Sequence, residues 1–264
     1  MRENVLALRM DDVGASSKRY EVYSDREWGV GPFRVSANWL WLKYLPGLRG
    51  WGVYRELTGK DWKALLAILE RFGARLTVAI TATWVENERR QVPFPEKFPG
   101  EAAMIKSGVA SGLLEIANHG LTHCVAEKDV FKPRWFDGNR KWHREFWDWI
   151  PGEVQHEHIR RAQDILQGYF GTDVVTFVPP GNVFGDATVA AARACGIRYI
   201  SCQATPRREN GMTIVGNEGI VPFHDRDIVM NGTQLLERKI RELTGREFVF
   251  VREAGRRYSE GVVA

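Results

Sequence analysis

The chain has 264 residues, enough for one large α/β domain, and its 44% hydrophobic and 27% charged residues are ordinary for a folded soluble protein. The formal net charge of +4 is a mild excess that favours anionic partners. Because the sequence has no basic run and no nucleic-acid motif, we expect no nucleic-acid partner. No apolar stretch is long enough to span a membrane, and the apolar part of the N-terminal segment is too short for a signal peptide. Three cysteines do not suggest a disulfide framework. We therefore expect a cytoplasmic protein.

The predicted elements alternate between strands and helices along the chain. Hydrophobic periodicity, capping residues and glycine stops predict strand 5–10, a helix from Asp61 to its cap at Gly73, strand 75–80, helix 101–112, strand 113–117, helix 153–169, strand 174–178, helix 187–194, strands 198–202 and 219–222, helix 233–243 and strand 248–251. Strands that alternate with helices imply parallel pairing. The pattern therefore predicts a layered or barrel α/β fold.

Two long segments, about 26–60 and 128–152, interrupt this alternation. They are rich in tryptophan, with Trp28, Trp39, Trp41 and Trp51 in the first and Trp135, Trp142, Trp147 and Trp149 in the second. Structured insertions of this length usually cover or build a site. The alternative, which we prefer for most individual tryptophans, is that they fill local cores.

The first predicted strand ends in two adjacent carboxylates, Asp11 and Asp12. Adjacent carboxylates repel each other unless a cation or hydrogen bonds offset the repulsion. A turn or cap role is the alternative. At the C-terminal end of a strand, however, one carboxylate can bind a metal while the other takes a proton from water.

His119 and His123 follow directly on the predicted strand 113–117. Two histidines four residues apart share a face when the backbone is helical, and neutral imidazoles suit zinc and similar divalent metals. Such a pair often arises by chance, but α/β folds place ligands at the ends of strands. Cys124 could add a further ligand, although we prefer a packing role for it.

Two more segments close later strands. Residues 179–182 read Pro-Pro-Gly-Asn, where the prolines stiffen the loop and Gly181 lets a backbone N–H approach a ligand closely. This donor could stabilise an oxyanion, although by itself the segment is merely a turn. His224 follows strand 219–222 and could protonate a leaving amine, with a surface or core histidine as the equal alternative. We expect the remaining histidines to be solvated: His143, His156 and His158.

The order of these motifs resembles the polysaccharide deacetylases of carbohydrate esterase family 4, which share the NodB homology domain. That family's first motif is Thr or Ser, Phe, Asp, Asp and Gly, where this chain has Arg-Met-Asp-Asp-Val-Gly at 9–14. Its second is His-Ser/Thr-x-x-His, where this chain has His-Gly-Leu-Thr-His at 119–123. Its third, Arg-x-Pro-x-Gly, and its last, Leu-x-His, resemble Val-Pro-Pro-Gly-Asn at 178–182 and Pro-Phe-His at 222–224. The resemblance covers most of the chain.

The resemblance implies a distorted (β/α)7-type barrel with loop insertions, in a single NodB-like domain over residues 1–264. It also implies that Asp12, His119 and His123 bind a divalent metal, for which we expect zinc, with cobalt, nickel, manganese and iron as alternatives. Asp11 is then the general base and His224 the general acid. By the same resemblance, the oxyanion and substrate loop contains Pro180, Gly181 and Asn182.

Several positions depart from the family pattern. Val178 replaces the arginine that orients the base, for which Arg226 or Arg9 could substitute. Gly120 stands where the family has Ser or Thr, and the family's aspartate and tryptophan motif has no clear match around 199–206. These departures indicate a divergent branch, similar to sequences near O-antigen and other surface-polysaccharide synthesis genes.

We therefore expect a metal-dependent hydrolase that removes an N-acetyl group from a sugar in a polysaccharide or its cytoplasmic precursor. The expected partner is an acetamido sugar or glycan, which the basic excess and the tryptophans suit if it is anionic. Two alternatives remain open. One is a hydrolase of a non-sugar amide, such as a cyclic ureide, and the other is a glycan-binding module without activity.

Overall fold

The computed structural model describes residues 4–19, 27–36, 42, 45, 55–87, 90–128 and 140–261 of the chain. The predicted insertions at 26–60 and 128–152 are therefore described only in part. Trp39, Trp41, Trp51 and Trp135 lie outside the described residues, so their roles stay predictions.

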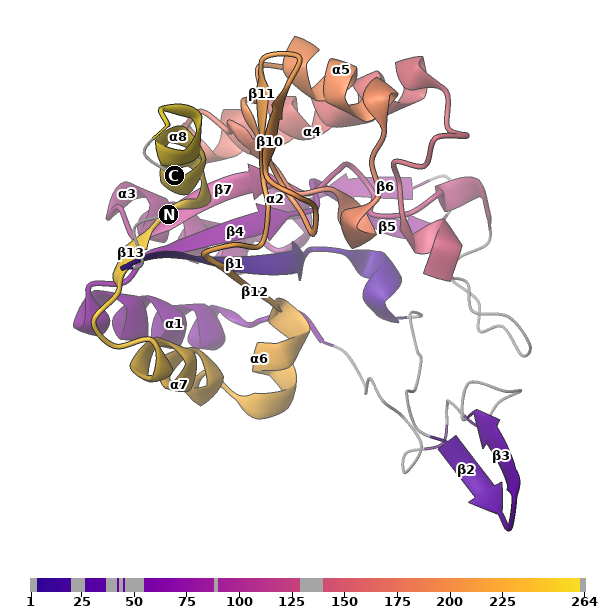
Figure 1. The fold of residues 1–264 in the computed structure, drawn as a ribbon, viewed down its shortest axis with the longest axis horizontal. Coiled ribbons are helices and arrows are strands. Elements are labelled where there is room, and N and C mark those ends of the chain that lie inside the picture. The colour runs from indigo at the N-terminus through magenta and orange to yellow at the C-terminus, as the bar shows by residue number, and fades with distance from the viewer. Residues whose placement is uncertain are drawn as a thin grey trace.

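A nine-stranded sheet organises the described part of the chain (Figure 1). Its order is β10-β11-β9-β8-β7-β4-β1-β12, and β13 also pairs with β1. All of these pairings are parallel except that of β10 with β11. The strands are β1 (Val5–Val13), β4 (Leu76–Ile80), β7 (Leu114–Asn118), β8 (Thr176–Phe177), β9 (Tyr199–Ser201), β10 (Arg207–Glu209), β11 (Met212–Val215), β12 (Ile220–His224) and β13 (Glu247–Val249).

The segment from β11 to β12 links the two ends of this sheet. β11 pairs with β9, β12 pairs with β1, and only residues 216–219 separate the two strands. The described pairings contain no ladder between β11 and β12 themselves. The predicted α/β fold with parallel strands and helices is confirmed, and the pairings of the described residues do not close the sheet into a barrel.

Helices cover the sheet on both sides (Figure 1), with α1, α6 and α7 on one side and α4 and α5 on the other. The α-helices are α1 (Gly59–Phe72), α2 (Phe94–Lys97), α3 (Pro99–Ala110), α4 (Gly152–Phe170), α5 (Asp186–Ala194), α6 (Asp225–Asn231), α7 (Gln234–Glu242) and α8 (Val251–Ser259). Short 3-10 helices are η1 (Ser16–Arg19), η3 (Ala126–Lys128), η4 (Arg140–His143) and η5 (Pro180–Asn182). Two small hairpins pair β2 (Glu27–Val30) with β3 (Phe33–Ser36) and β5 (Thr83–Asn87) with β6 (Arg90–Pro93).

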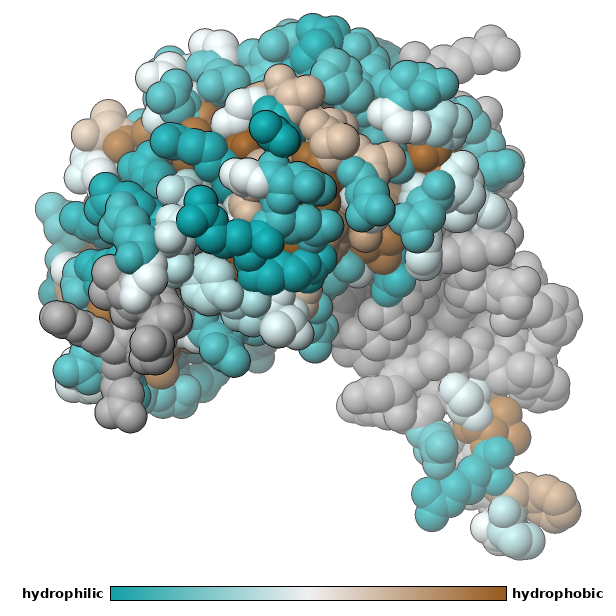
Figure 2. Space-filling view, turned by 45° about the horizontal axis from the view of Figure 1, so that its top comes forward, coloured by the Kyte–Doolittle hydropathy of each residue, from teal (hydrophilic) through white to brown (hydrophobic). Residues whose placement is uncertain are grey.

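The core lies between the sheet and these helices. Its largest cluster joins α1, α3, α4 and α7 to strands β1, β4 and β7, and it contains Trp62, which is 1% exposed. A second cluster joins α4 and α5 to β8, β9 and β11. Figure 2 shows that hydrophilic residues dominate the described part of one face, where apolar residues form small, separate areas. No helix among the described residues is both long and apolar enough to cross a membrane.

The helix predicted from Asp61 illustrates how local signals set an element. Asp61 is not its first residue but the third, where its carboxylate accepts from the backbone N–H of Thr58 at 2.9 Å, while the Thr58 hydroxyl accepts from Asp61 N–H at 3.3 Å. Gly73 ends the helix in the left-handed conformation, as predicted. The prediction of strand 248–251 is wrong at its end, because Val251 begins α8 and Glu253 caps that helix at the Phe250 N–H.

Candidate active site

The carboxyl ends of β1, β7, β8 and β12 carry the residues that the sequence singled out. Because these strands are parallel members of one sheet, their carboxyl ends lie at the same edge. β1 ends with Asp11 and Asp12, β7 leads into His119, β8 leads into the loop 178–182, and β12 ends at His224. The sheet therefore brings together segments that are far apart in the chain.

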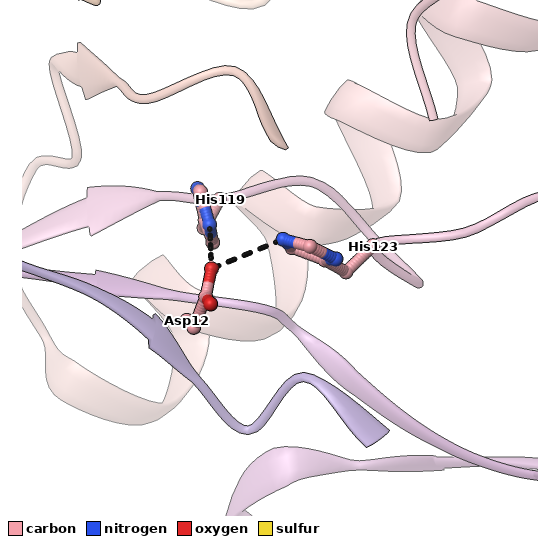
Figure 3. A group of neighbouring side chains, drawn as sticks. All are labelled: Asp12, His119 and His123. Atoms are coloured by element: carbon pink, nitrogen blue, oxygen red, sulfur yellow. Dashed lines mark hydrogen bonds and ion pairs between the residues drawn. The ribbon is translucent and has the colours of Figure 1, made fainter. Parts of the chain in front are cut away.

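Asp12 lies at an irregularity in β1. The register between β1 and β4 shifts between Met10 and Val13, and Asp12 adopts a left-handed backbone with φ of 71°. A non-glycine residue in this conformation costs about 1–2 kcal/mol, which the surrounding structure must offset. The carboxylate of Asp12 is buried, and it faces the two imidazoles (Figure 3).

His119 and His123 converge on the same oxygen of Asp12. Asp12 Oδ1 lies 3.1 Å from His119 Nε2 and 3.1 Å from His123 Nε2 (Figure 3). The backbone between the two histidines is not helical, since residues 121–124 form bends and His123 has a φ of 57°. A tight turn after β7, rather than a helix face, aligns the pair.

The other ring nitrogen of each histidine is held by a neighbour. His119 Nδ1 lies 2.6 Å from the backbone oxygen of Val178, and His123 Nδ1 lies 3.2 Å from the hydroxyl of Ser17. A carbonyl oxygen only accepts, so His119 Nδ1 must be the donor, and in a neutral ring Nε2 then carries a lone pair. These contacts aim both Nε2 atoms at Asp12.

The electrostatics of this cluster require a positive charge between its members. A lone pair on His119 Nε2 facing Asp12 Oδ1 at 3.1 Å is repulsive unless a proton or a metal ion lies between them. Burial alone would raise the pKa of Asp12, but the imidazoles of His123 and His119 outweigh burial and hold that pKa well below its usual range. The three ligand atoms lie within 4.8 Å of one another, and one carboxylate with two imidazoles is a donor set typical of zinc and related divalent metals. The residues present therefore fit a divalent metal.

Asp11 is held by Arg9 in a buried bidentate pair. Arg9 Nε donates to Asp11 Oδ1 and Nη2 donates to Oδ2, both at 2.8 Å, while Nη1 donates to the Ser201 hydroxyl at 2.8 Å. Residues two apart on a strand point to the same face, a signal that favours Arg9 from the sequence alone. Of the two arginines considered, Arg9 makes the described contact with Asp11. Arg226 is buried in the first turn of α6, where its backbone N–H donates to the Asp225 carboxylate at 2.7 Å.

His224 lies beside these carboxylates. Its Cα pairs with that of Asp11 in the register of β12 on β1, and its Nδ1 lies 3.6 Å from Asp227 Oδ2. Burial alone lowers the pKa of His224, but Asp227, Asp12 and Asp11 together raise it to about 9. The imidazole is therefore protonated at neutral pH in the metal-free protein, and its side chain keeps an exposed fraction of 40%.

The loop after β8 leaves Gly181 as its candidate backbone donor. Pro180 has no N–H, and the N–H of Asn182 donates to the Pro179 oxygen at 3.0 Å. The Asn182 side chain accepts from the Gln203 N–H at 2.8 Å, which ties the loop to the segment after β9. Gly181 has a φ of 61°, and a Cβ there would lie 2.7 Å from Arg144 Nε, so the loop is built for glycine at this position.

Three buried residues near the site belong to none of the sequence motifs: Lys18, Ser17 and Glu145. Lys18 pairs with Asp225 at 2.5 Å and also donates to the backbone oxygen of Asp12, so it joins the end of β1 to α6. Ser17 holds His123, as described above. Glu145 accepts from three successive backbone N–H groups, those of residues 121–123.

The expectation that the remaining histidines are solvated is wrong for His143 and His158. His143 is 1% exposed, and the His158 side chain is 26% exposed because it packs onto Glu145, with 2.6 Å between Nδ1 and Oε1. Burial alone would lower the pKa of His158, but the contact with Glu145 raises it. Burial alone would raise the pKa of Glu145, but His158 together with the backbone N–H groups of Thr122 and His123 lowers it. Cys124 is buried in a small apolar cluster with Val85 and Ala126, which agrees with the packing role preferred for it.

The sequence matches the family described as polysaccharide deacetylase over residues 57–200. No curated protein matches it. Among solved structures, the Xyl-CE4 domain of a multidomain xylanase from the hindgut metagenome of Trinervitermes trinervoides is 16% identical, with a TM-score of 0.52 over 98% of this chain and 92% of that chain. A Mycobacterium smegmatis protein assigned to the polysaccharide deacetylases is 12% identical, with a TM-score of 0.55 over 79% of each chain.

These matches agree with the α/β fold described above. At 16% and 12% identity, the two solved structures indicate that this chain shares their fold, and nothing more. The family match spans more than half of the chain and includes His119, His123 and Gly181, whereas Asp11, Asp12 and His224 lie outside it and join the site through the sheet. The chain belongs to the polysaccharide deacetylase family.

Proposed function

We propose that the protein is a divalent-metal-dependent hydrolase that removes the N-acetyl group of an acetamido sugar. The observation that carries the proposal is the convergence of Asp12, His119 and His123, with Asp11 held next to them by Arg9. The family membership supports a deacetylase, and the buried donor set supports the metal.

In this proposal Asp12, His119 and His123 hold the metal, for which zinc suits the donor set best and cobalt, nickel, manganese and iron are alternatives. When bound, a divalent metal supplies a Lewis acid that polarises the acetyl carbonyl and acidifies water. Ser17 and the Val178 carbonyl fix both imidazoles, so that little reorganisation is needed on binding.

Asp11 is the proposed general base. The bidentate pair with Arg9 holds its carboxylate in one orientation, ready to take the proton of the attacking water. In this proposal the pair takes the place of the arginine that the family has at position 178, with the cation coming from the same strand as the base.

His224 is the proposed general acid. Its imidazolium lies next to Asp11 across the β1–β12 pairing and donates its proton to the nitrogen of the departing amine. The N–H of Gly181 is the proposed backbone donor to the oxyanion. Each protein group thus has one role in amide hydrolysis.

The substrate class rests on the surroundings of the site. Trp142 and Trp149 form an edge-to-face pair 5.6 Å apart, and Trp149 is 52% exposed, as suits a surface for sugar rings. Arg144 lies against Gly181 and over Trp147, which suits an anionic sugar or a phosphate-linked precursor. A cytoplasmic location, a single domain and a role in surface-polysaccharide (lipopolysaccharide) synthesis stay predictions, of which cell fractionation tests the first.

The decisive test is Asp11→Asn, with Asp173→Asn at an exposed site as the control. We expect acetate release from N-acetyl sugars to fall by about 10²–10⁴-fold while zinc binding persists, because the base is lost and the metal ligands remain. Unchanged turnover in the Asp11→Asn variant would refute the role of the base.

A second candidate is hydrolysis of a non-sugar amide, which the arginine's shift from position 178 to position 9 favours as a departure from the family pattern. A panel of N-acetyl sugars and cyclic amides, followed by acetate release and ring opening, separates the two. An inactive glycan-binding module would bind N-acetyl sugars in protein stripped of metal and would hydrolyse neither class.

A further inference from the structure

The buried carboxylate of Glu145 binds the turn that carries His123. Glu145 comes from the segment between η4 and α4, and its side chain is 1% exposed. Its Oε1 accepts from the Leu121 N–H at 3.1 Å, and its Oε2 accepts from the N–H groups of Thr122 at 3.1 Å and His123 at 2.9 Å. One side chain therefore binds all three amides of the turn.

These bonds matter because the turn has no other regular structure to satisfy its amides. Residues 121–124 belong to no helix or strand, and they are all buried. A buried N–H without a partner costs about 1–3 kcal/mol, and hydrogen bonds to a charged acceptor are stronger than neutral ones. Glu145 thus supplies the hydrogen-bond acceptors that a β-ladder or a helix would otherwise supply to these amides.

Gly120 makes room for this carboxylate. It has a φ of 79°, and a Cβ added there would lie 2.3 Å from Glu145 Oε2 and 3.0 Å from the Phe146 ring. No side chain fits at position 120 while Glu145 occupies its place. Glycine in the second motif, where the resembled family has serine or threonine, therefore goes together with an acid at 145.

The turn in turn sets the direction of His123. His123 has a left-handed backbone with φ of 57°, and its own N–H makes the shortest backbone bond to Glu145. That conformation is unfavourable for a non-glycine residue and persists only where neighbours impose it. With the backbone held this way, Nε2 lies 3.1 Å from Asp12 Oδ1.

We propose that Glu145 is a positioning residue for the metal site, acting through the backbone of the 121–123 turn to hold the imidazole of His123 in coordinating geometry. The inference rests on the proposed function, since it takes His123 as a metal ligand. His158 holds Glu145 in place, because its Nδ1 lies 2.6 Å from Glu145 Oε1 and anchors the carboxylate to α4.

The test measures zinc affinity and the electronic spectrum of the cobalt-substituted protein for Glu145→Gln, with Glu153→Gln at an exposed site of the adjoining helix as the control. The amide keeps the size of the carboxylate but offers one acceptor oxygen in place of two. We expect zinc to bind about 10–100-fold more weakly and the cobalt spectrum to change, with the control unaffected. Zinc affinity within twofold of the wild type, together with an unchanged cobalt spectrum, overturns the proposal.

A second pair of variants approaches the same contact from the other side. Gly120→Ala places a methyl group against Glu145 Oε2, whereas Gly196→Ala has the same φ of 79° and open space around it. We expect only the first to weaken zinc binding, and equal zinc affinities in the two variants would contradict the proposal. This pair decides the matter even if Glu145→Gln does not fold, and wild-type protein that binds no metal would instead refute the proposed function.

Discussion

Arg9→Lys is the sharpest test of how Asp11, the proposed base, is held. Arginine reaches both oxygens of Asp11 and the hydroxyl of Ser201 with three nitrogens, each at 2.8 Å. Lysine keeps the positive charge but carries a single nitrogen, so it cannot reproduce the fork. The variant therefore separates charge from orientation.

The expected magnitude follows from the bonds lost. A hydrogen bond to a charged group contributes about 1.5–3 kcal/mol, and lysine retains at most one of the two bonds to the carboxylate. A loss of this size corresponds to a decrease of roughly 10- to 150-fold in kcat/KM if the bond orients the base in the transition state. Zinc affinity stays unchanged, because Arg9 contacts none of the proposed ligands among the described interactions.

The assay follows acetate release from an N-acetyl sugar that the wild type hydrolyses, with zinc affinity measured in parallel. Arg75→Lys is the control at an exposed site, where the single nitrogen Nη1 of Arg75 donates to both oxygens of Glu253, at 3.0 and 3.1 Å, so that lysine can keep this contact. If Arg9→Lys keeps kcat/KM within twofold of the wild type, or loses no more than Arg75→Lys, the fork does not orient the base.

Two further predictions concern the other side of the reaction. In the metal-free protein we expect the ring of His224 to titrate with a pKa of about 9, and Asp227→Asn to lower that pKa, as NMR titration of the imidazole measures. A pKa near 6.5 in the wild type would contradict the assignment. The stability that this raised pKa contributes is complete below the ordinary value of about 6.5 and is lost as the pH rises through 9. Gly181→Ala lowers the free energy of unfolding by about 1–2 kcal/mol through backbone strain, and by more through its contact with Arg144. The control Gly171→Ala, with φ of 66° and open space around it, suffers the strain alone. Equal losses of the two variants in urea unfolding would show that Arg144 simply moves aside.

Much of the fold could be predicted because its signals are local. The helix after Thr58 has its cap and its glycine stop in the sequence, and the strand before Asp11 is a short apolar run. The position of the metal-binding candidates followed from one topological rule, that parallel strands present their carboxyl ends at one edge. Resemblance in motif order added the roles.

What could not be predicted depends on three-dimensional packing. Nothing local indicates that Asp12 adopts a left-handed backbone or that the histidine pair lies on a turn rather than a helix. Glu145 lies 22 residues beyond His123 inside a tryptophan-rich segment, without a motif to mark it. Arg9 was within reach of the sequence, since its spacing of two from Asp11 is the period of a strand.

The pairing of β1 with β12 has a consequence for how the protein becomes competent. Residues 11 and 224 meet as register partners, although more than two hundred residues of synthesis separate them. A ribosome-bound chain that stops short of β12 holds both imidazoles and Asp11, the proposed base, but lacks His224, the proposed proton donor. Contacts between segments so distant form slowly in folding. On the proposed function, activity therefore begins only when the sheet is assembled nearly to its last strand, and the appearance of acetate release during refolding times that late event.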